Sequence, residues 1–441
     1  MKIKRITVGN YKNIAQTTLD CSRMIALVSA NNYGKSNLLE AIRFGLEFIT
    51  RSTKGRTASM HWIKGIPLSD ALAGEDFVFS IEFDEPTLEE YRYVRYGYKF
   101  SWYNDQGTGG RISDETIEIR STESVKYTSF LKRSEGKYRA SKNTTAFRKL
   151  FLTQDALAID AIGMMEDVDI GEVIKQIKSI GYRLCDSLEL DDSFDPSPIE
   201  FDFGENITLG NEDIPRMLSM LQKKKPELYD LYVETIYDLF PEFTNIELQA
   251  LAVKEKDSSS RLQAVMVTPS SDNGKEKKTE IPYHIRDELY RLIISSKHLN
   301  QPISMEHMST GTKRIFWLVA NAVVSEYKKI NILGVDEIET SIHPKMIKNL
   351  LEALSEILGN TSLVLTSHSP YLIQYLKPED IYVGLPNEEG VACFRKIQTK
   401  KIKALLNTTR KLETSIGEYL FELMSGDSDS AQVLSSYLEE A

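Results

Sequence analysis

The sequence predicts an α/β protein in which a mixed sheet is combined with helices. Three short apolar runs carry this prediction, and each leads directly into polar residues; they lie within residues 25–28, 331–337 and 362–370. Continuous apolar runs of this length are typical of strands buried on both faces. After the first run, apolar residues recur at the spacing of a helix: Leu38, Leu39, Ile42 and Leu46. We therefore expect a strand, a polar loop and a helix in succession, with the rest of the chain organised around this unit.

The polar loop of this unit has the composition of a phosphate-binding loop. It runs from Ser29 to Ser36 and ends in Gly-Lys-Ser. Such a loop directs backbone N–H groups and a helix N-terminus at an anion, so that Lys35 reaches the outer phosphates and the Ser36 hydroxyl holds Mg²⁺. The first position is Ser29 rather than the usual Gly, which makes the loop slightly atypical, since Ser adopts unusual backbone conformations less readily. The expected ligand is ATP with Mg²⁺, contacted by Asn32, Gly34, Lys35, Ser36 and Asn37.

The composition is that of a globular chain able to bury a large core. It has 441 residues, of which 41% are hydrophobic, and this length suggests two or three structural units. A net charge of −10 argues against affinity for nucleic acid along the whole chain, because such binding depends on Lys and Arg. Cys21, Cys185 and Cys393 match no metal-ligand or redox spacing, and no apolar run reaches 18 residues. We expect a cytoplasmic protein with free thiols and no membrane segment.

Residues 1–145 are expected to form an N-terminal lobe that joins the phosphate loop to an antiparallel sheet. After the phosphate loop, a helix is expected over 37–50 and a polar loop over 51–65, and a helix-like turn is expected over 86–91. Short apolar or alternating segments predict the strands of this lobe, which lie within residues 3–8, 17–20, 24–28, 77–83, 91–102, 112–120 and 124–131.

Residues 146–300 are expected to form an insertion of helices and strands, and residues 301–441 the C-terminal lobe. No seven-residue repeat persists over several heptads, so a long coiled coil is not expected. Residues 246–253 and 262–268 have the pattern of a hairpin closed by the polar loop 270–280. Apolar residues every three or four positions predict the helices of the insertion, over 150–162, 170–188, 214–240 and 282–294.

Two adjacent carboxylates, Asp336 and Glu337, end the second buried run. Adjacent side chains at the end of a strand diverge. One carboxylate can therefore enter the shell of a metal ion while the next faces a water molecule that attacks the terminal phosphate. The sequence thus predicts that Asp336 binds Mg²⁺ and that Glu337 is the general base.

Two further stretches complete a pattern that resembles a known class. Residues 308–314 (Met-Ser-Thr-Gly-Thr-Lys-Arg) open a long apolar helix, and residues 362–370 form a buried strand that ends in His368. Together with the phosphate loop and the paired carboxylates, they resemble the ATP-binding-cassette class of ATPases, in the branch shared by RecF-like, chromosome-maintenance-like and OLD-like proteins. The resemblance covers residues 1–50 and 300–376 well and the middle poorly. It implies an ABC-type P-loop ATPase core with a helical and β insertion.

This resemblance also implies roles for single residues. Lys12, in Asn-Tyr-Lys-Asn-Ile, is similar to a basic residue that contacts nucleotide. Ser309 and Gly311 resemble the signature motif, which completes the ATP site of the opposite subunit and whose hydroxyl, N–H and helix N-terminus favour the terminal phosphate. His368 resembles the switch histidine that senses this phosphate and acts with Glu337 and Lys35 in catalysis.

The resemblance extends to the region after the paired carboxylates and to the metal site. Residues 336–344 resemble the Asp-Glu-x-Glu-x-x-x-His-Pro form of this branch, with Ile338 where Pro is frequent, and His343 in this form can equally cap a turn. The family supplies a glutamine to Mg²⁺ from the junction of the lobes, and Gln154 is the candidate here.

These resemblances imply a homo-oligomer in which ATP is sandwiched between two chains. About 70 residues follow His368, too few for the metal-binding Toprim nuclease domain of OLD-like proteins, and Asp427 and Asp429 follow a helix rather than a strand. A separate effector protein is therefore expected, as in the ATPase components of antiphage systems such as PARIS and Septu. A RecF-like DNA repair ATPase and a transport ATPase remain as alternatives; the first requires a basic surface and the second a membrane partner.

Charge is distributed unevenly along the chain. Residues 126–149 hold eight Lys or Arg and one acid, and residues 395–411 hold seven basic residues and no acid. Residues 184–215 hold ten acids and no base. Either basic run could contact DNA, although a charge run is more often a solvated face. The acidic run could in the same way dock a basic partner.

Overall fold

The computed structural model divides the chain into two compact units, which differ from the three consecutive segments expected from the sequence. Unit 1 comprises residues 1–185, 328–340 and 358–441, and unit 2 comprises residues 186–327 and 341–357. The structure describes residues 1–104, 107–186, 190, 193–195, 199–201, 213–253, 262–267, 279–385 and 389–440. Most of the acidic run 184–215 therefore lies outside the described residues.

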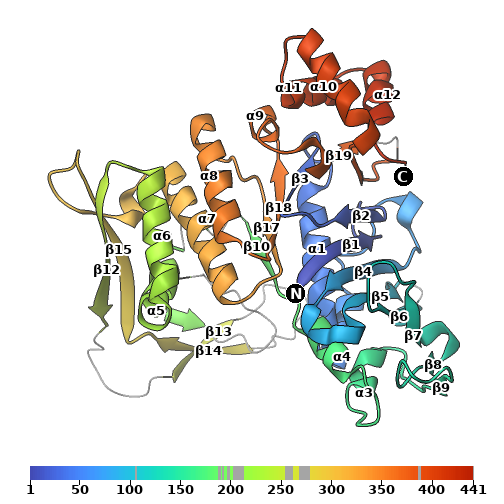
Figure 1. Ribbon diagram of the computed structural model, residues 1–441. Helices are drawn as coiled ribbons and strands as arrows, with labels where there is room; N and C mark the ends of the chain where they lie inside the picture. The colour runs from blue at the N-terminus through green and yellow to red at the C-terminus, as the bar shows by residue number, and fades with distance from the viewer. Residues whose placement is uncertain are drawn as a thin grey trace, which may run out of the picture. The chain divides into compact units, whose positions relative to one another are not determined.

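A six-stranded sheet of unit 1 carries the phosphate loop. Its strand order is β10-β17-β18-β3-β19-β20, and all neighbouring pairs are parallel except β19 and β20. The three central strands are almost fully buried and place the three predicted apolar runs side by side (Figure 1). The bounds of the strands are β3 Met24–Val28, β10 Tyr182–Cys185, β17 Ile332–Val335, β18 Ser362–Ser367, β19 Ile381–Leu385 and β20 Cys393–Lys396.

A second sheet of unit 1 is wholly antiparallel, as predicted, and has the order β2-β1-β4-β5-β6-β7-β8-β9. Helix α1 (Lys35–Thr50) packs against it through an aromatic cluster that includes Phe44, Phe77, Phe100 and Trp102. The strands are β1 Lys2–Gly9, β2 Thr17–Asp20, β4 Phe77–Asp84, β5 Tyr93–Ser101, β6 Arg111–Arg120, β7 Thr128–Lys132, β8 Lys137–Tyr138 and β9 Arg148–Lys149.

Short helices complete unit 1. At its C-terminal end, α10, α11 and α12 cluster beside α9 and β19 (Figure 1) and share an apolar core that includes Leu405, Leu420 and Leu434. Asp427 accepts a hydrogen bond from Ser430 N and caps α12, as expected for a polar helix end. The helices are α2 Thr53–Met60, α3 Ala158–Ile162, α4 Gly171–Lys178, α9 Pro370–Ile373, α10 Ile402–Lys411, α11 Ile416–Ser425 and α12 Ser428–Tyr437.

In its described residues, unit 2 combines four packed helices with two small antiparallel sheets. The helices are α5 Ile214–Lys224, α6 Pro226–Leu239, α7 Thr310–Tyr327 and α8 Pro344–Ile357, and Tyr232 and Phe316 meet between α6 and α7. One sheet has the order β12-β15-β16 and the other β11-β14-β13. The strands are β11 Ile199–Phe201, β12 Phe243–Ala252, β13 Leu262–Val267, β14 Thr279–Ile285, β15 Glu288–Ser296 and β16 Ile303–Ser304.

The structure corrects five predictions of local structure. Of the predicted helix 150–162, only residues 158–162 are helical. The predicted helix 170–188 ends at Lys178, because residues 182–185 pair in parallel with β17. Residues 282–294, predicted as a helix, form parts of β14 and β15 instead. In β15 every second side chain, Tyr290, Leu292 and Ile294, is buried. Short apolar runs fit both periods, and pairing with another strand decided between them.

The other two corrections concern a hairpin and a loop. The expected hairpin of 246–253 with 262–268 is wrong, since β12 pairs with β15 and β13 with β14; most of the polar loop 270–280 lies outside the described residues. Residues 53–60, expected within a loop, form α2, whose N-cap is Ser52.

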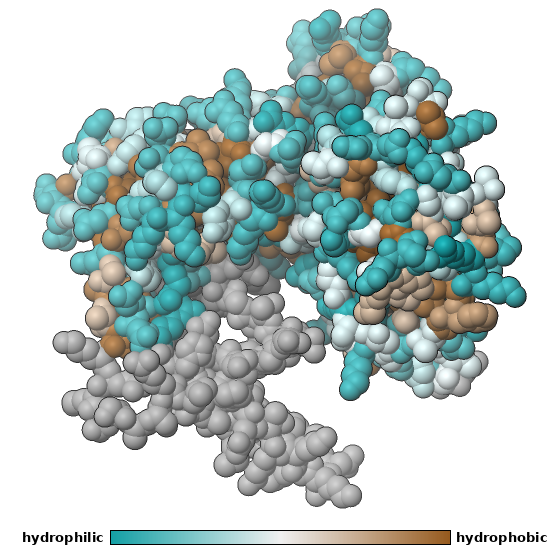
Figure 2. All heavy atoms as spheres, turned by 60° about the horizontal axis from the view of Figure 1, so that its bottom comes forward, coloured by the Kyte–Doolittle hydropathy of each residue, from teal (hydrophilic) through white to brown (hydrophobic). Residues whose placement is uncertain are grey.

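On the face that Figure 2 shows, the coloured residues are mostly hydrophilic, with hydrophobic side chains in separate areas between them. Within the described parts of the chain, no helix has the length and apolar character needed to span a membrane.

Candidate functional site

The loop after β3 has the backbone of a phosphate-binding loop without strain at its atypical first position. Asn32 (φ 59°) and Gly34 (φ 119°) adopt left-handed conformations, and Ser29 does not. Ser29 is fully buried, and its hydroxyl lies near the carbonyl oxygen of Ala30. The left-handed turn at Gly34 allows α1 to begin at Lys35, so the loop leads directly into the N-terminus of a 16-residue helix. Ser29 therefore needs no glycine-like conformation here.

Lys35 lies inside the loop with its ammonium group surrounded by acceptors. Its Nζ donates to the carbonyl oxygens of Ser29 and Ala30, both at 3.1 Å, and lies 3.2 Å from His368 Nδ1. Only 4% of the residue is exposed. Burial lowers the pKa of Lys35 to about 8, although the carboxylates of Asp336 and Glu337 oppose this shift. A buried ammonium group held at the N-terminus of a helix is well placed to meet the negative charge of a phosphate.

The Ser36 hydroxyl and the Asp336 carboxylate meet in front of the loop. Ser36 Oγ donates to Asp336 Oδ2 at 2.7 Å, and Thr366 Oγ1 donates to Asp336 Oδ1 at 2.5 Å. Hydroxyl and carboxylate oxygens are the ligands that Mg²⁺ prefers. Ser36 lies in the first turn of α1, and Asp336 directly follows β17. Because the hydrogen bond from Thr366 also fixes the carboxylate, these residues fit a site for Mg²⁺.

Glu337 turns away from Asp336, as expected for adjacent side chains after a strand. Its backbone is left-handed (φ 46°), and its N–H donates to Thr366 Oγ1 at 2.8 Å. Its carboxylate is half exposed, accepts a hydrogen bond from Thr340 Oγ1, and lies 3.6 Å from His368 Nε2. A water molecule can therefore reach this carboxylate, which a general base requires.

His368 lies between Lys35 and Glu337. Burial, and then the charge of Lys35, lower the pKa of His368 below its ordinary value, so the imidazole is neutral at pH 7. Glu339 fixes the backbone before the ring: its Oε1 accepts hydrogen bonds from His368 N at 2.6 Å and from Ser367 Oγ at 3.0 Å. A neutral imidazole in a fixed position can donate or accept a hydrogen bond at a phosphate oxygen.

One small cavity joins these groups. Its volume is about 150 Å³, and it is lined by Asn32, Tyr33, Gly34, Lys35, Ser36, Asn37, Glu337 and His368. The structure thus brings together the predicted phosphate-loop residues, the predicted base and the predicted switch histidine, with Asp336 in contact through Ser36.

Lys12 approaches the same helix from the β1–β2 connection. Its Nζ donates to Asn37 Oδ1 at 3.1 Å and forms an ion pair with Glu40. Asn37 in turn donates to Asn13 Oδ1 at 2.8 Å. These contacts attach the connection to the first turns of α1, beside the phosphate loop.

Ser309 and Gly311 lie in unit 2 at the start of α7. The Ser309 hydroxyl accepts a hydrogen bond from Thr312 N at 3.2 Å, which caps the helix. A Cβ atom at position 311 would lie 2.4 Å from the carbonyl oxygen of Ser341, so Gly311 permits close contact with the segment that follows the paired carboxylates. In this segment, His343 Nδ1 accepts a hydrogen bond from Lys345 N, so that His343 caps a turn.

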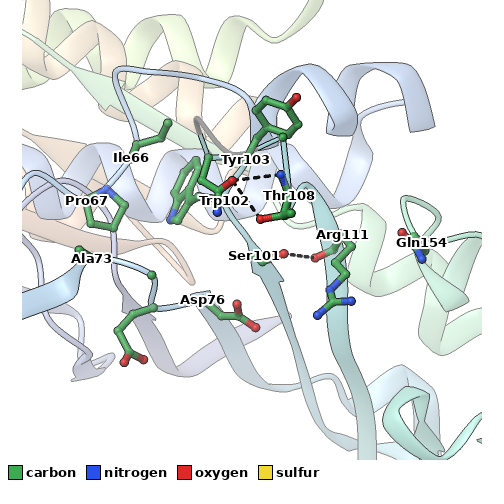
Figure 3. A pocket seen from close by; sticks show the side chains of 15 residues that line it. Ile66, Pro67, Ala73, Asp76, Ser101, Trp102, Tyr103, Thr108, Arg111 and Gln154 are labelled. Atoms are coloured by element: carbon green, nitrogen blue, oxygen red, sulfur yellow. Dashed lines mark hydrogen bonds between the residues drawn. The ribbon is translucent and has the colours of Figure 1, made fainter.

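Gln154 is not among the residues that line the phosphate-loop cavity. It lines a different pocket of about 820 Å³, together with Trp102, Tyr103 and Arg111 (Figure 3). Its backbone carbonyl accepts a hydrogen bond from Ile112 N at 2.8 Å, which attaches the segment to β6. The structure therefore places the predicted metal ligand on another surface of unit 1, away from the residues that surround Ser36.

Two residues of the site were missed from the sequence, Thr366 and Glu339. Thr366 is fully buried at the end of β18 and hydrogen-bonds both the Asp336 carboxylate and the Glu337 backbone. The sequence could have indicated Thr366, because its hydroxyl lies at the end of an apolar run, two residues before His368. For Glu339, the indication was the second Glu of the Asp-Glu-x-Glu pattern.

The fold and the phosphate loop define the class of this protein, a P-loop ATPase with an ABC-type core. Residues 24–374 match the model of the family described as "AAA domain, putative AbiEii toxin, Type IV TA system". This match covers most of the chain, and the protein belongs to this family.

Two further comparisons agree with this assignment. The chain is 21% identical over 436 residues to the retron Ec83 probable ATPase of Escherichia coli, an alignment that covers 87% of this chain and 71% of the relative. A crystal structure of an SMC head bound to the C-winged helix domain of ScpA is 13% identical with a TM-score of 0.50, and the match covers 91% of this chain and 99% of that one. The second likeness supports the ABC-type fold alone.

Proposed function

We propose that the protein binds and hydrolyses ATP with Mg²⁺ and uses the resulting change of state to control a separate effector, a nuclease, in antiphage defence. The observation that carries the ATPase part is the meeting of Lys35, Ser36, Glu337 and His368 around one cavity, with Asp336 bonded to Ser36. A phosphate-loop lysine, a metal-binding pair, a base and a neutral histidine are the parts that phosphoryl transfer to water requires.

The proposed mechanism follows from these positions. The α1 N-terminus and Lys35 bind the outer phosphates. Ser36 and Asp336 would hold Mg²⁺, which would supply positive charge to neutralise the transferred phosphoryl group. Glu337 accepts the proton of the attacking water, and its exposed carboxylate gives that water access. His368 contacts the terminal phosphate, and Glu339 keeps its backbone in place.

We further propose that the complete site requires a second copy of the chain. The first subunit supplies the phosphate loop, and the second supplies the α7 N-terminus with Ser309 and Gly311. A hydroxyl, an N–H and the positive end of an 18-residue helix suit a phosphate anion. The protein would then form an ATP-sandwich dimer in the cytoplasm.

The effector part of the proposal rests on relatives. The chain is similar to the probable ATPase of a retron, and the matched family is described with a toxin of a toxin–antitoxin system. A RecF-like repair ATPase is the second candidate, because α10 carries exposed basic side chains.

Two variants test the ATPase proposal. Lys35→Ala removes the buried cation and should abolish ATP binding, whereas Glu337→Gln should bind ATP, stop turnover and accumulate the dimer. Binding is measured by calorimetry, turnover by phosphate release and dimer formation by light scattering. Unchanged turnover in Glu337→Gln would mean that another residue is the base, and normal ATP affinity in Lys35→Ala would exclude the phosphate-loop assignment.

The effector proposal needs a separate experiment. Tagged Glu337→Gln protein is recovered from its native cells with and without phage infection, and the bound protein and nucleic acid are identified. A stoichiometric protein gained or lost on infection supports effector control. Recovery of DNA alone, unchanged by infection, supports the repair ATPase instead.

A further inference from the structure

Helix α10 carries one polar face that is basic from end to end. At 100° per residue, Lys403, Asn407, Arg410 and Lys411 lie within about 100° of one another, and Lys400 of the preceding turn continues the row. All five are exposed, whereas Leu405 and Thr409 on the opposite face are buried in the core shared with α11 and α12. We call Lys400, Lys403, Asn407, Arg410 and Lys411 the α10 stripe.

The four charges of the α10 stripe are not neutralised by neighbours. Within the described parts of the chain, none of the four forms a salt bridge or side-chain hydrogen bond. Acids lie at the ends of the stripe: Glu413 follows it in the sequence, and Glu439 and Glu440 line a surface hollow with Lys400. The middle of the stripe therefore presents uncompensated positive charge.

The other basic run of the sequence behaves differently. In residues 126–149, Lys132 and Lys137 both pair with Glu135, and the pairs Lys142–Glu90, Arg148–Asp167 and Arg133–Glu115 also form. Five of its eight basic side chains are thus already matched by acids, so this run has little charge left for a ligand. Of the two predicted DNA-contact candidates, the structure favours the C-terminal one.

A favourable interaction with the helix dipole accounts for only two of the four basic side chains of the α10 stripe. Arg410 and Lys411 lie in the last turn, where cations interact favourably with the helix dipole. Lys400 and Lys403 lie at the N-terminal end, where the dipole disfavours cations. The first turn contains no acid, and Lys401 at the N-cap provides no side-chain cap. Basic side chains at this end lower the stability of the helix but favour the binding of an anion there.

We propose that the α10 stripe binds the phosphate backbone of a nucleic-acid duplex without regard to sequence. From Lys400 to Lys411 the helix rises about 16 Å, close to the axial length of five phosphates along one strand of a duplex. Residues 400–411 contain no aromatic side chain, so the stripe has no platform on which single-stranded bases would stack. Charge without stacking groups favours a duplex over a single strand.

The test measures duplex binding by full-length protein as a function of salt, without ATP, so that it does not depend on the proposed ATPase activity. The probe is a fluorescent 30-base-pair DNA of mixed sequence. Four phosphate contacts predict a slope of log K against log salt near −3.6, or roughly a 150-fold loss of affinity between 50 and 200 mM salt. Duplex RNA and single-stranded DNA of equal length are measured in parallel.

The variant Lys403→Gln/Arg410→Gln/Lys411→Gln removes three charges and keeps good helix-forming residues. It should reduce the slope to about −0.9 and weaken binding at 50 mM salt by about tenfold or more. The matched control Lys132→Gln/Lys137→Gln/Lys175→Gln changes net charge equally at ion-paired positions and should leave the slope unchanged. Both variants should keep the circular dichroism and ATP affinity of the parent.

Three results would overturn the proposal. They are absence of duplex binding at 50 mM salt, an equal slope in the α10 variant and the parent, and tighter binding of single-stranded DNA through the same residues. Equal loss in the control variant would also count against it, because the effect would then reflect net charge rather than the stripe. If DNA and RNA duplexes bind equally, backbone recognition is supported; the two duplexes differ mainly in groove shape and the 2′-hydroxyl.

Discussion

Lys35 should make ATP affinity depend on pH in the alkaline range. In the protein alone its pKa is lowered to about 8 from 10.5 by burial, so the ammonium group loses its proton near pH 8. A bound triphosphate places negative charge beside Nζ and raises this pKa again. ATP binding is therefore expected to take up protons at and above pH 8.

The magnitude follows from this pKa. The uptake should be about 0.1 proton per site at pH 7, about 0.5 at pH 8 and about 0.9 at pH 9, and Kd should rise roughly tenfold per pH unit above 8. Neither His368, whose pKa is lowered from 6.5, nor the phosphate of ATP, with a second pKa of about 6, titrates in this window.

Stability in the same pH range should change in the opposite direction. The folded-state pKa of Lys35 is below its unfolded value, so the unfolded chain binds more protons between pH 8 and 10.5. The contribution of Lys35 to the free energy of unfolding therefore increases as the pH rises through this window, by up to about 3 kcal/mol. General alkaline denaturation would lower both ATP affinity and stability. A fall in ATP affinity together with a rise in stability therefore indicates the titration of Lys35.

The assay is titration calorimetry of ATP with Mg²⁺ at pH 7, 8 and 9, each in two buffers of different ionisation enthalpy. Lys35→Arg is the control, because a guanidinium group stays charged throughout this range and should remove the proton uptake. An unchanged Kd between pH 7 and 9 with no proton uptake at pH 8 would refute the reasoning.

Three further predictions test contacts outside the phosphate loop. Thr366→Val removes the hydroxyl that bonds the Asp336 carboxylate and the Glu337 backbone N–H after β17; turnover should fall about 10- to 100-fold while ATP binding is kept, and equal turnover by phosphate release would contradict this. Burial raises the pKa of Glu115 to about 7, so its contribution to stability falls as the pH rises from 4.5 through 7, and Glu115→Gln should flatten the dependence of Tm on pH in this range. Gly417→Ala would place a methyl group 2.0 Å from the carbonyl oxygen of Pro370, two residues after His368. This substitution should lower the free energy of unfolding by about 1–3 kcal/mol, measured with denaturant, and should also lower turnover. The control Gly171→Ala, whose new methyl group meets nothing within 4 Å, should change neither quantity.

Local pattern was sufficient to predict the elements that carry the phosphate site. The strand, loop and helix around Lys35 are contiguous in the sequence, and their periodicity and loop composition are visible without tertiary information. The same holds for Asp336 and Glu337, which directly follow a strand that is buried along its whole length. Where the chain supplies both the residue and its neighbours within a few positions, the sequence predicts the local structure well.

Pairing between distant segments was the part that local pattern could not supply. Residues 182–185 became a strand because β17 offers a parallel partner, and residues 288–296 because β12 offers an antiparallel one. Gln154 illustrates the same limit at the level of a site. Its position depends on how its segment is attached to β6, and that attachment carries it to a different pocket.

Thr366 and Glu339 show how this limit affects the site itself. Thr366 lies at the end of β18 but bonds Asp336 and Glu337, which follow β17. Glu339 follows β17 but bonds the backbone of His368, which follows β18. These reciprocal bonds exist only because β17 and β18 are adjacent and in parallel register. The backbones of Glu337 and His368 are therefore each held by a side chain from the other's strand end, so that a shift of either strand end displaces both. Under the proposed function, this coupling is the route by which the state of the terminal phosphate would reach the segments that follow β17 and β18.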